Sequence, residues 1–266
     1  MEAFFPMSFE RWEKKVQPVD LAASRITFLS DAHLGATIHG AQLREDALRS
    51  FLEDLPGKTD RIVFLGDMFD FWIEYEGWIR PELRFFVHAL QALSHAGIRL
   101  DYVPGNHDFS IEDALKRTCN VTIHPPHIEF RLFGKRFFAS HGDRLTDTAR
   151  HHRILRRMLW HPGNLRLYKR LPRSTAIRLA LWFSALSRNS KNDATQMRSA
   201  DTMRRVGFSL LQSGYDGAIL AHTHKADTAR WNGRQYCNTG QWLHRYTYVT
   251  LDRNGLILHE FLPHSG

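Results

Sequence analysis

Short apolar runs alternate with helical stretches through the first half of the chain. The runs 25–30, 61–65 and 98–103 are rich in apolar and β-branched residues and have the length of buried strands. Residues 42–55 and 81–95 lie between them and are predicted to be helical, the second helix opening with a proline. This strand–helix–strand–helix–strand order predicts a parallel sheet that is covered by helices.

The second half of the chain is predicted to be mainly β structure around one helical segment. After a short helix at 111–118, strands are expected at 121–123, 128–132, 136–140, 217–221, 229–231, 235–237, 246–251 and 256–261. Hairpin turns are expected at Phe133-Gly134-Lys135, Asn232-Gly233 and Asn254-Gly255. We therefore predict an α/β fold, a two-sheet β sandwich flanked by helices, in a single domain 1–266 with a helical insertion at 145–211.

The basic charge of the chain is concentrated in that insertion. The formal net charge is +8, yet no acidic residue occurs between Asp147 and Asp193, where 11 of the 36 Lys and Arg lie. The rest of the chain carries 25 basic and 28 acidic residues. Such a basic segment suits an anionic membrane surface, a phosphorylated substrate or nucleic acid.

Other bulk features lead us to expect a cytoplasmic protein. No run of 18 apolar residues occurs, and the N-terminus does not resemble a secretory signal. Cys119 and Cys237 lack the spacing of a zinc site and are expected to be ordinary thiols in a reducing compartment.

Polar clusters follow the predicted strands at the points where they end. The clusters are Asp31 and His33; Asp67 and Asp70; Asn106, His107 and Asp108; His141; and His222 and His224. Because ligands gather beyond the carboxyl ends of strands in α/β sheets, we expect the five clusters to converge. Each cluster alone is common in turns, but five in order indicate a shared site.

The residue types in these clusters indicate a binuclear metal centre. Carboxylates, imidazoles and an amide, without thiolates, suit divalent manganese, iron or zinc. Asp67 is the expected bridging ligand because its strand should be central in the sheet. Two metal ions ~4 Å apart could activate a water molecule and neutralise the charge that develops on a phosphate.

The motif order D-x-H, GDxxD, GNHD, HGD and HTH resembles the calcineurin-like metallophosphoesterase superfamily, from Asp31 to His224. The resemblance implies two divalent metal ions, one held by Asp31, His33, Asp67 and His224, the other by Asp67, Asn106, His141 and His222. It also implies that His107 protonates the leaving oxygen or stabilises the transition state, with Asp108 or a neighbour orienting it. Asn106 and His107 would also contact the substrate.

A narrower resemblance is to the UDP-2,3-diacylglucosamine diphosphatases of lipid A biosynthesis. It rests on GDMFDFW, PGNHDF, and HGD followed by a basic helical insertion that ends near Ser190 and Lys191. The resemblance implies hydrolysis of a nucleotide-linked glycolipid to UMP and 2,3-diacylglucosamine 1-phosphate, with manganese as the expected metal. The insertion would be a lid that lies on the anionic inner membrane surface, with Ser190 and Lys191 as substrate contacts. No nucleic-acid partner is expected.

Some positions leave alternatives open. His107 stands where better-known members of that family carry Arg, Ala194 and Met197 replace Asn and Lys, and Ala221 replaces a glycine. Residues 237–242 (CNTGQW) resemble a less characterised branch that keeps GNHD. The apolar residues 176–186 could line an acyl groove or simply pack on the core. A nuclease or nucleotide phosphodiesterase with the same metals is the alternative enzyme, and a non-catalytic scaffold is the alternative outside enzymes.

Overall fold

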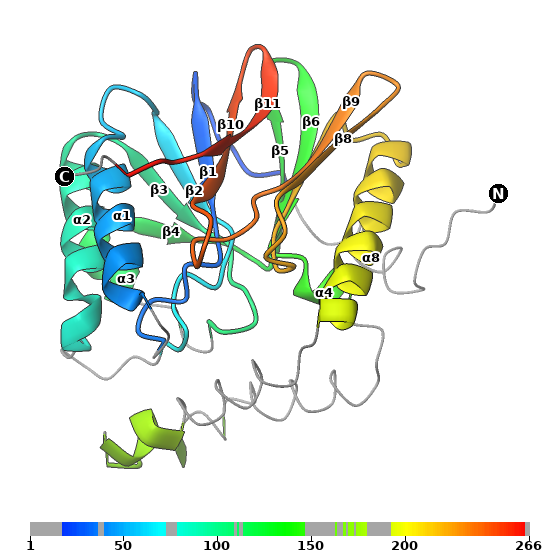
Figure 1. The fold of residues 1–266 in the computed structure, drawn as a ribbon. Helices are drawn as coiled ribbons and strands as arrows, with labels where there is room; N and C mark the ends of the chain where they lie inside the picture. Colours follow the sequence, from blue (N-terminus) through cyan, green and yellow to red (C-terminus); the bar gives the residue numbers. More distant parts are fainter. Residues whose placement is uncertain are drawn as a thin grey trace.

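Two β-sheets pack face to face at the centre of the fold, and helices cover their outer faces (Figure 1). The computed structural model describes residues 18–36, 40–72, 79–108, 111, 114–146, 163, 167–168, 170–172, 174–179 and 193–263, with no side chains described at 114 and 193–196. Across the interface between the sheets, the rings of Phe28 and Phe130 are 6.3 Å apart.

The first sheet has six strands in the order β11-β10-β1-β2-β3-β4. They are β1 (Ile26–Leu29), β2 (Arg61–Phe64), β3 (Arg99–Tyr102), β4 (Val121–Ile123), β10 (Thr247–Asp252) and β11 (Gly255–Glu260). Strands β1 to β4 are parallel, and β10 and β11 extend the sheet as an antiparallel pair. Strand β2 therefore lies inside the sheet, as the sequence predicts.

The second sheet has five strands in the order β5-β6-β7-β9-β8. They are β5 (His127–Leu132), β6 (Lys135–Ser140), β7 (Gly217–Leu220), β8 (Asp227–Trp231) and β9 (Arg234–Asn238). Strands β6, β7 and β9 are parallel, so their carboxyl ends lie at one edge. The loops that follow β6 and β7 therefore reach the same end of this sheet.

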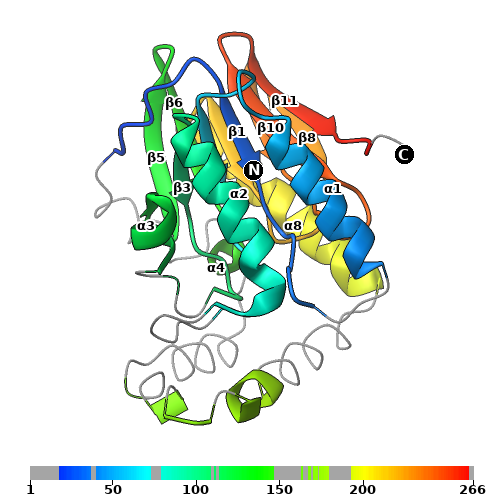
Figure 2. The ribbon, with the colours of Figure 1, turned by 90° about the vertical axis from the view of Figure 1, so that its left-hand side faces the viewer.

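The helices form the outer layers. They are α1 (Ala41–Glu53), the 3₁₀ turn η1 (Pro81–Leu83), α2 (Arg84–His95), α3 (Ala114–Cys119), α4 (Asp143–Thr146) and α8 (Asp193–Gln212). Figure 2 shows α1 and α2 side by side across the first sheet, and their apolar residues share one core cluster with β1 to β3. Helix α8 covers the second sheet through Met203, Leu210 and Leu211.

Apolar side chains on both faces explain why the central strands are continuous apolar runs in the sequence. Phe28 and Val63 lie in the core between the sheets, whereas Leu29 and Phe64 pack in the core under the helices. A parallel sheet that is covered on both sides requires this pattern.

The predicted α/β sandwich is confirmed, and the described strands begin and end within about two residues of their predicted positions. The first hairpin differs in detail, because its turn consists of Phe133 and Gly134 alone, with φ 51° and 74°. Lys135 already belongs to β6. The helix predicted at 111–118 is α3, which begins at Ala114.

The predicted insertion at 145–211 is described only in part. Residues 193–211 of it belong to α8, which packs on the second sheet. Ser190 and Lys191 lie outside the described residues. Among the described helices, none is long and apolar enough to cross a membrane.

Candidate metal centre

The loops after five strands meet at one end of the sandwich. Asp31 follows β1, Asp67 follows β2, Asn106 follows β3, His141 follows β6 and His222 follows β7. The parallel direction of these strands explains the convergence within each sheet, and the packing of the two sheets unites the loops. The structure thus brings together all seven side chains that the sequence predicts as metal ligands.

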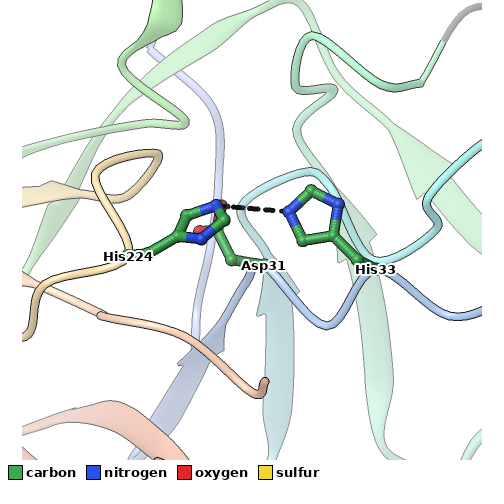
Figure 3. A group of neighbouring side chains, drawn as sticks. All are labelled: Asp31, His33 and His224. Carbon is green, nitrogen blue, oxygen red and sulfur yellow. Dashed lines mark hydrogen bonds and ion pairs between the residues drawn. The ribbon is translucent and has the colours of Figure 1, made fainter. Parts of the chain in front are cut away.

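Asp31, His33 and His224 form what we call the first ligand group (Figure 3). The Nε2 atoms of His33 and His224 are 3.2 Å apart, and Nε2 of His224 is 3.1 Å from Asp31 Oδ1. Nε2 of His33 lies 3.9 Å from the same oxygen. Three ligand atoms therefore converge on one point.

Asp67, Asn106, His141 and His222 form the second ligand group. Nε2 of His141 lies 3.2 Å from Asp67 Oδ2, from Asn106 Oδ1 and from His222 Nδ1. His33 and His107 also have ligand atoms close to Asp67. Asp67 therefore stands between the two groups, where a bridging ligand has to be.

These side chains fit a pair of divalent cations. Nδ1 of His141 is 2.8 Å from the carbonyl oxygen of Leu65, so the proton sits on Nδ1 and Nε2 is left for a metal. The buried Asp31 Oδ1 has no hydrogen-bond partner among the described residues. Such a cluster of buried acceptors is unfavourable unless a cation or proton satisfies it. The set lacks thiolates, which is consistent with manganese, iron or zinc.

The pKa values of Asp67 and His141 in the second group depend strongly on each other. Burial opposes ionisation of Asp67, but His141 and His107 outweigh it and hold its pKa well below the ordinary value. Burial also opposes the charged form of His141, but Asp67 and Asp31 raise its pKa to about 10. In the first group, burial and then the neighbouring His107 and His224 lower the pKa of His33. Asp67 and Asp31 therefore favour positive charge at this point of the site.

Five of the seven predicted metal ligands have backbone φ angles in the left-handed region. The φ angles are 53° at Asp31, 43° at His33, 53° at Asp67, 71° at His222 and 58° at His224. Each such residue costs about 1 kcal/mol or more, and strain of this kind clusters at functional sites. Hydrogen bonds between loops hold the conformation, such as that from His33 N to Asp67 O at 3.0 Å.

Glycine allows the loops to come this close. A Cβ atom on Gly105 would lie 2.3 Å from Asp67 Oδ1, and one on Gly66 would lie 2.4 Å from the Gly105 nitrogen. This close approach explains why GD and PGN appear in the sequence beside the ligands.

His107 faces Asp67 from the rim of the site. Its backbone N–H donates to Asp67 Oδ1 at 2.9 Å, and its Nε2 is 4.0 Å from Asp67 Oδ2. Its Nδ1 lies 2.8 Å from the carbonyl oxygen of Asp70, which orients the ring. The sequence could not identify this partner because a backbone carbonyl leaves no trace in a motif.

Asp108 makes its hydrogen bonds elsewhere. Its carboxylate accepts from the backbone N–H groups of Asp67 and Gly105, at 2.9 and 2.8 Å, and from the Tyr102 hydroxyl at 3.0 Å. Burial, and then the nearby Asp67, raise the pKa of Asp108 to about 7. Asp108 therefore connects the loop of Asp67 with the loop of Gly105. The ring of His107 is oriented by the carbonyl group of Asp70 and not by Asp108. Tyr102 was not singled out from the sequence.

Comparison with known proteins places the site in a family. The model of the calcineurin-like phosphoesterase family matches residues 24–226, which include every ligand named above. Proteins named UDP-2,3-diacylglucosamine hydrolase are similar: that of Porphyromonas gingivalis is 28% identical over 88% of this chain and 97% of its own length. That of Edwardsiella ictaluri is 27% identical over 90% and 93%, and that of Pseudomonas paraeruginosa is 30% identical over 75% and 82%. This chain therefore belongs to the calcineurin-like phosphoesterase family and is a metal-dependent hydrolase.

Proposed function

We propose that this chain is a UDP-2,3-diacylglucosamine diphosphatase, which releases UMP and 2,3-diacylglucosamine 1-phosphate. The observation that carries the proposal is its similarity to hydrolases named for that substrate over 88% and 90% of the chain. The similarity extends past residue 226, where the family model ends. It also spans the range of the basic insertion.

The two ligand groups are proposed to hold two divalent cations, with Asp67 shared between them. Manganese is the proposed metal, and iron or zinc are the alternatives that the donor set also suits. When bound, such cations supply Lewis-acid activation of water and neutralise charge on the phosphate. Asn106 and His107, at the open side of the second group, are proposed to contact the phosphate.

His107 is proposed to act as an imidazolium with a proton on each ring nitrogen, because the Asp70 carbonyl oxygen can only accept a hydrogen bond from Nδ1. Because Nδ1 is engaged with the Asp70 carbonyl oxygen, Nε2 is the ring nitrogen that faces the reaction site. A proton there can be donated to a leaving oxygen or can stabilise the negative charge of the transition state. Asp108 is proposed to act through the two loops that it braces, and Ser190 and Lys191 to contact the substrate as in the family resemblance.

The insertion is proposed to bind acyl chains and to rest on the cytoplasmic face of the inner membrane. Three large apolar side chains of the insertion are exposed, Leu167 by 64%, Leu179 by 36% and Met197 by 61%. The exposed Arg170, Arg178 and Arg198 lie in the same part of the chain. Exposed apolar side chains beside cations suit a lipid with a phosphate headgroup and an anionic surface.

A contact between two aromatic rings supports the proposal that the insertion forms a lid close to the metal centre. The ring of Tyr168 is 6.1 Å from that of Phe71, four residues after Asp67. The Tyr168 hydroxyl also donates to the carbonyl oxygen of Ala176, which is buried. Tyr168 of the insertion therefore lies beside the loop that follows β2.

Glutamate at both Leu167 and Leu179 is expected to raise the KM for the diacylated substrate by roughly 10-fold or more. Each apolar side chain that loses contact with an acyl chain costs about 1–2 kcal/mol. The kcat should change little because neither residue belongs to a ligand group. Initial rates measured against substrate concentration in mixed micelles test this.

Ile257→Glu is the matched control, since Ile257 is 44% exposed on β11 and outside the insertion. It should leave the KM unchanged. An unchanged KM in the double variant would contradict a role of these leucines in lipid binding.

The experiment for the proposed function incubates manganese-loaded protein with UDP-2,3-diacylglucosamine and measures UMP. UDP-N-acetylglucosamine, which lacks the two long acyl chains, is the matched control and should react much more slowly. If no UMP is released while bis(p-nitrophenyl) phosphate is hydrolysed, the substrate is wrong and the metal chemistry stands. A nuclease or nucleotide phosphodiesterase would give that second result.

A further inference from the structure

The segment that connects β9 to β10 lies next to Asp31 of the first ligand group. It begins at Asn238, the last residue of β9, and crosses from the second sheet to β10 in the first. Asn238 and Thr239 are 1% and 0% exposed, although neither belongs to a ligand group. These residues belong to the CNTGQW segment, 237–242, whose buried polar residues have no part in the proposed catalytic roles.

Thr239 is connected to Asp31 through Ser30. The Oγ1 atom of Thr239 is 2.7 Å from Ser30 Oγ, which is 2.5 Å from Asp31 Oδ2. An ionised carboxylate only accepts hydrogen bonds, so the single proton of Ser30 points to Asp31. Thr239 Oγ1 has two acceptors within reach, Ser30 Oγ at 2.7 Å and Leu220 O at 3.3 Å, and the shorter contact to Ser30 takes its single proton. We call this chain of two hydrogen bonds, from Thr239 to Ser30 and from Ser30 to Asp31, the relay.

This relay decides which oxygen of Asp31 faces the first ligand group. Oδ2 accepts from Ser30 and also from the backbone N–H of His222, at 3.2 Å. Oδ1 is left without a hydrogen bond, 3.1 Å from Nε2 of His224. Without the relay, Oδ2 would keep only the longer bond, and the carboxylate could rotate away from its two histidines.

The start of the relay is itself held rigidly. The backbone N–H of Thr239 donates to Leu220 O at 2.9 Å, and that of Trp242 donates to Asp31 O at 3.1 Å. Gly240 has φ 79°, and a Cβ there would lie 2.2 Å from Thr247 Oγ1. The fully buried Trp242 packs on Phe51 with ring centroids 4.8 Å apart. The segment is therefore a fixed support and not a loose loop.

We propose that Ser30 and Thr239 are positioning residues that set the Asp31 carboxylate for the cation of the first ligand group. This inference rests on the metal assignment proposed above. Hydrogen bonds to a ligating carboxylate orient it and tune its affinity, and their loss typically costs 10–100-fold in metal affinity. Because the relay reaches Asp31 alone, its loss should weaken one metal site and spare the other.

The test is a calorimetric titration of metal-stripped protein with Mn²⁺. Thr239→Val and Ser30→Ala should weaken one of the two Mn²⁺ sites by about 10–100-fold and leave the other unchanged. Thr239→Ser restores the hydroxyl and should restore the affinity. Thr27→Val is the matched control, because Thr27 is a buried residue of β1 whose hydroxyl bonds to that of Thr59 at 3.1 Å and to no metal ligand in the described structure.

Asp31→Ala identifies which step of the titration belongs to the first ligand group. If both sites kept their Mn²⁺ affinity in Thr239→Val, the relay would be wrong and the metal assignment would stand. The same conclusion would follow if Thr239→Val and Thr27→Val weakened Mn²⁺ binding at both sites to the same extent. A wild-type protein that binds no Mn²⁺ would overturn the metal assignment, and the relay with it. Thermal melts of all variants show whether a change in affinity follows a general loss of stability.

Discussion

Alanine at Asp67 is expected to abolish turnover and to remove one metal ion from the protein. Asp67 is the carboxylate next to both ligand groups, with Oδ2 3.2 Å from Nε2 of His141. A lost metal removes several kcal/mol of transition-state stabilisation, and each 1.4 kcal/mol is a factor of ten in rate. The kcat should fall by at least ~10³-fold. Steady-state kinetics and metal analysis of the same preparation measure both effects.

Asp60→Asn is the matched control, because Asp60 lies at the other end of the same strand and accepts hydrogen bonds from Ser24 and Arg25. It should keep both metals and the wild-type kcat. If Asp67→Ala kept two metal ions and measurable turnover, Asp67 would not be the shared ligand. The second ligand group would then consist of Asn106, His141 and His222.

The sequence predicts that the side chains of the two ligand groups converge because each cluster follows an apolar strand. A run such as Arg61–Phe64 has to be buried, and its end fixes where Asp67 emerges. The parallel order of the strands then brings the loops to one edge. The sheet order also follows in part, since alternating strands and helices leave few topologies.

The partners that orient these ligands could not be predicted in the same way. His107 is oriented by a backbone carbonyl, and every residue offers one. The relay from Thr239 through Ser30 joins residues 209 positions apart, and Ser or Thr near a turn is usually explained locally. Only the packing of β9 and β10 against β1 reveals it.

The hairpin at Phe133 shows a limit of turn rules. A Phe with φ 51° is sterically unfavourable, so the pattern Phe-Gly-Lys suggests a longer turn with one glycine in the left-handed region. Pairing of Leu132 with Lys135 closes the turn after two residues instead. The six-residue ladder of β5 and β6, with its buried Phe130 and Phe137, outweighs the local preference.

Alanine at His107 is expected to keep both metal ions and to lower the kcat by ~10²–10⁴-fold, the usual contribution of a general acid. The ring lies beside both ligand groups, 4.9 Å from that of His33, but its Nδ1 is engaged with Asp70. Metal analysis and the kcat of the same sample separate a catalytic role from a ligand role. Loss of metal would show that His107 is a ligand, and the proposed role would be wrong.

Leaving groups of different basicity distinguish the two proposed roles of His107. If the residue protonates the leaving oxygen, the defect of His107→Ala should be large for an alkyl phosphodiester and much smaller for a p-nitrophenyl ester. p-Nitrophenolate leaves without a proton, so a general acid contributes little to its departure. If His107 instead stabilises charge on the phosphate, both substrates should lose the same factor. His88→Ala, on the exposed face of α2, is the matched control and should react like wild type with both.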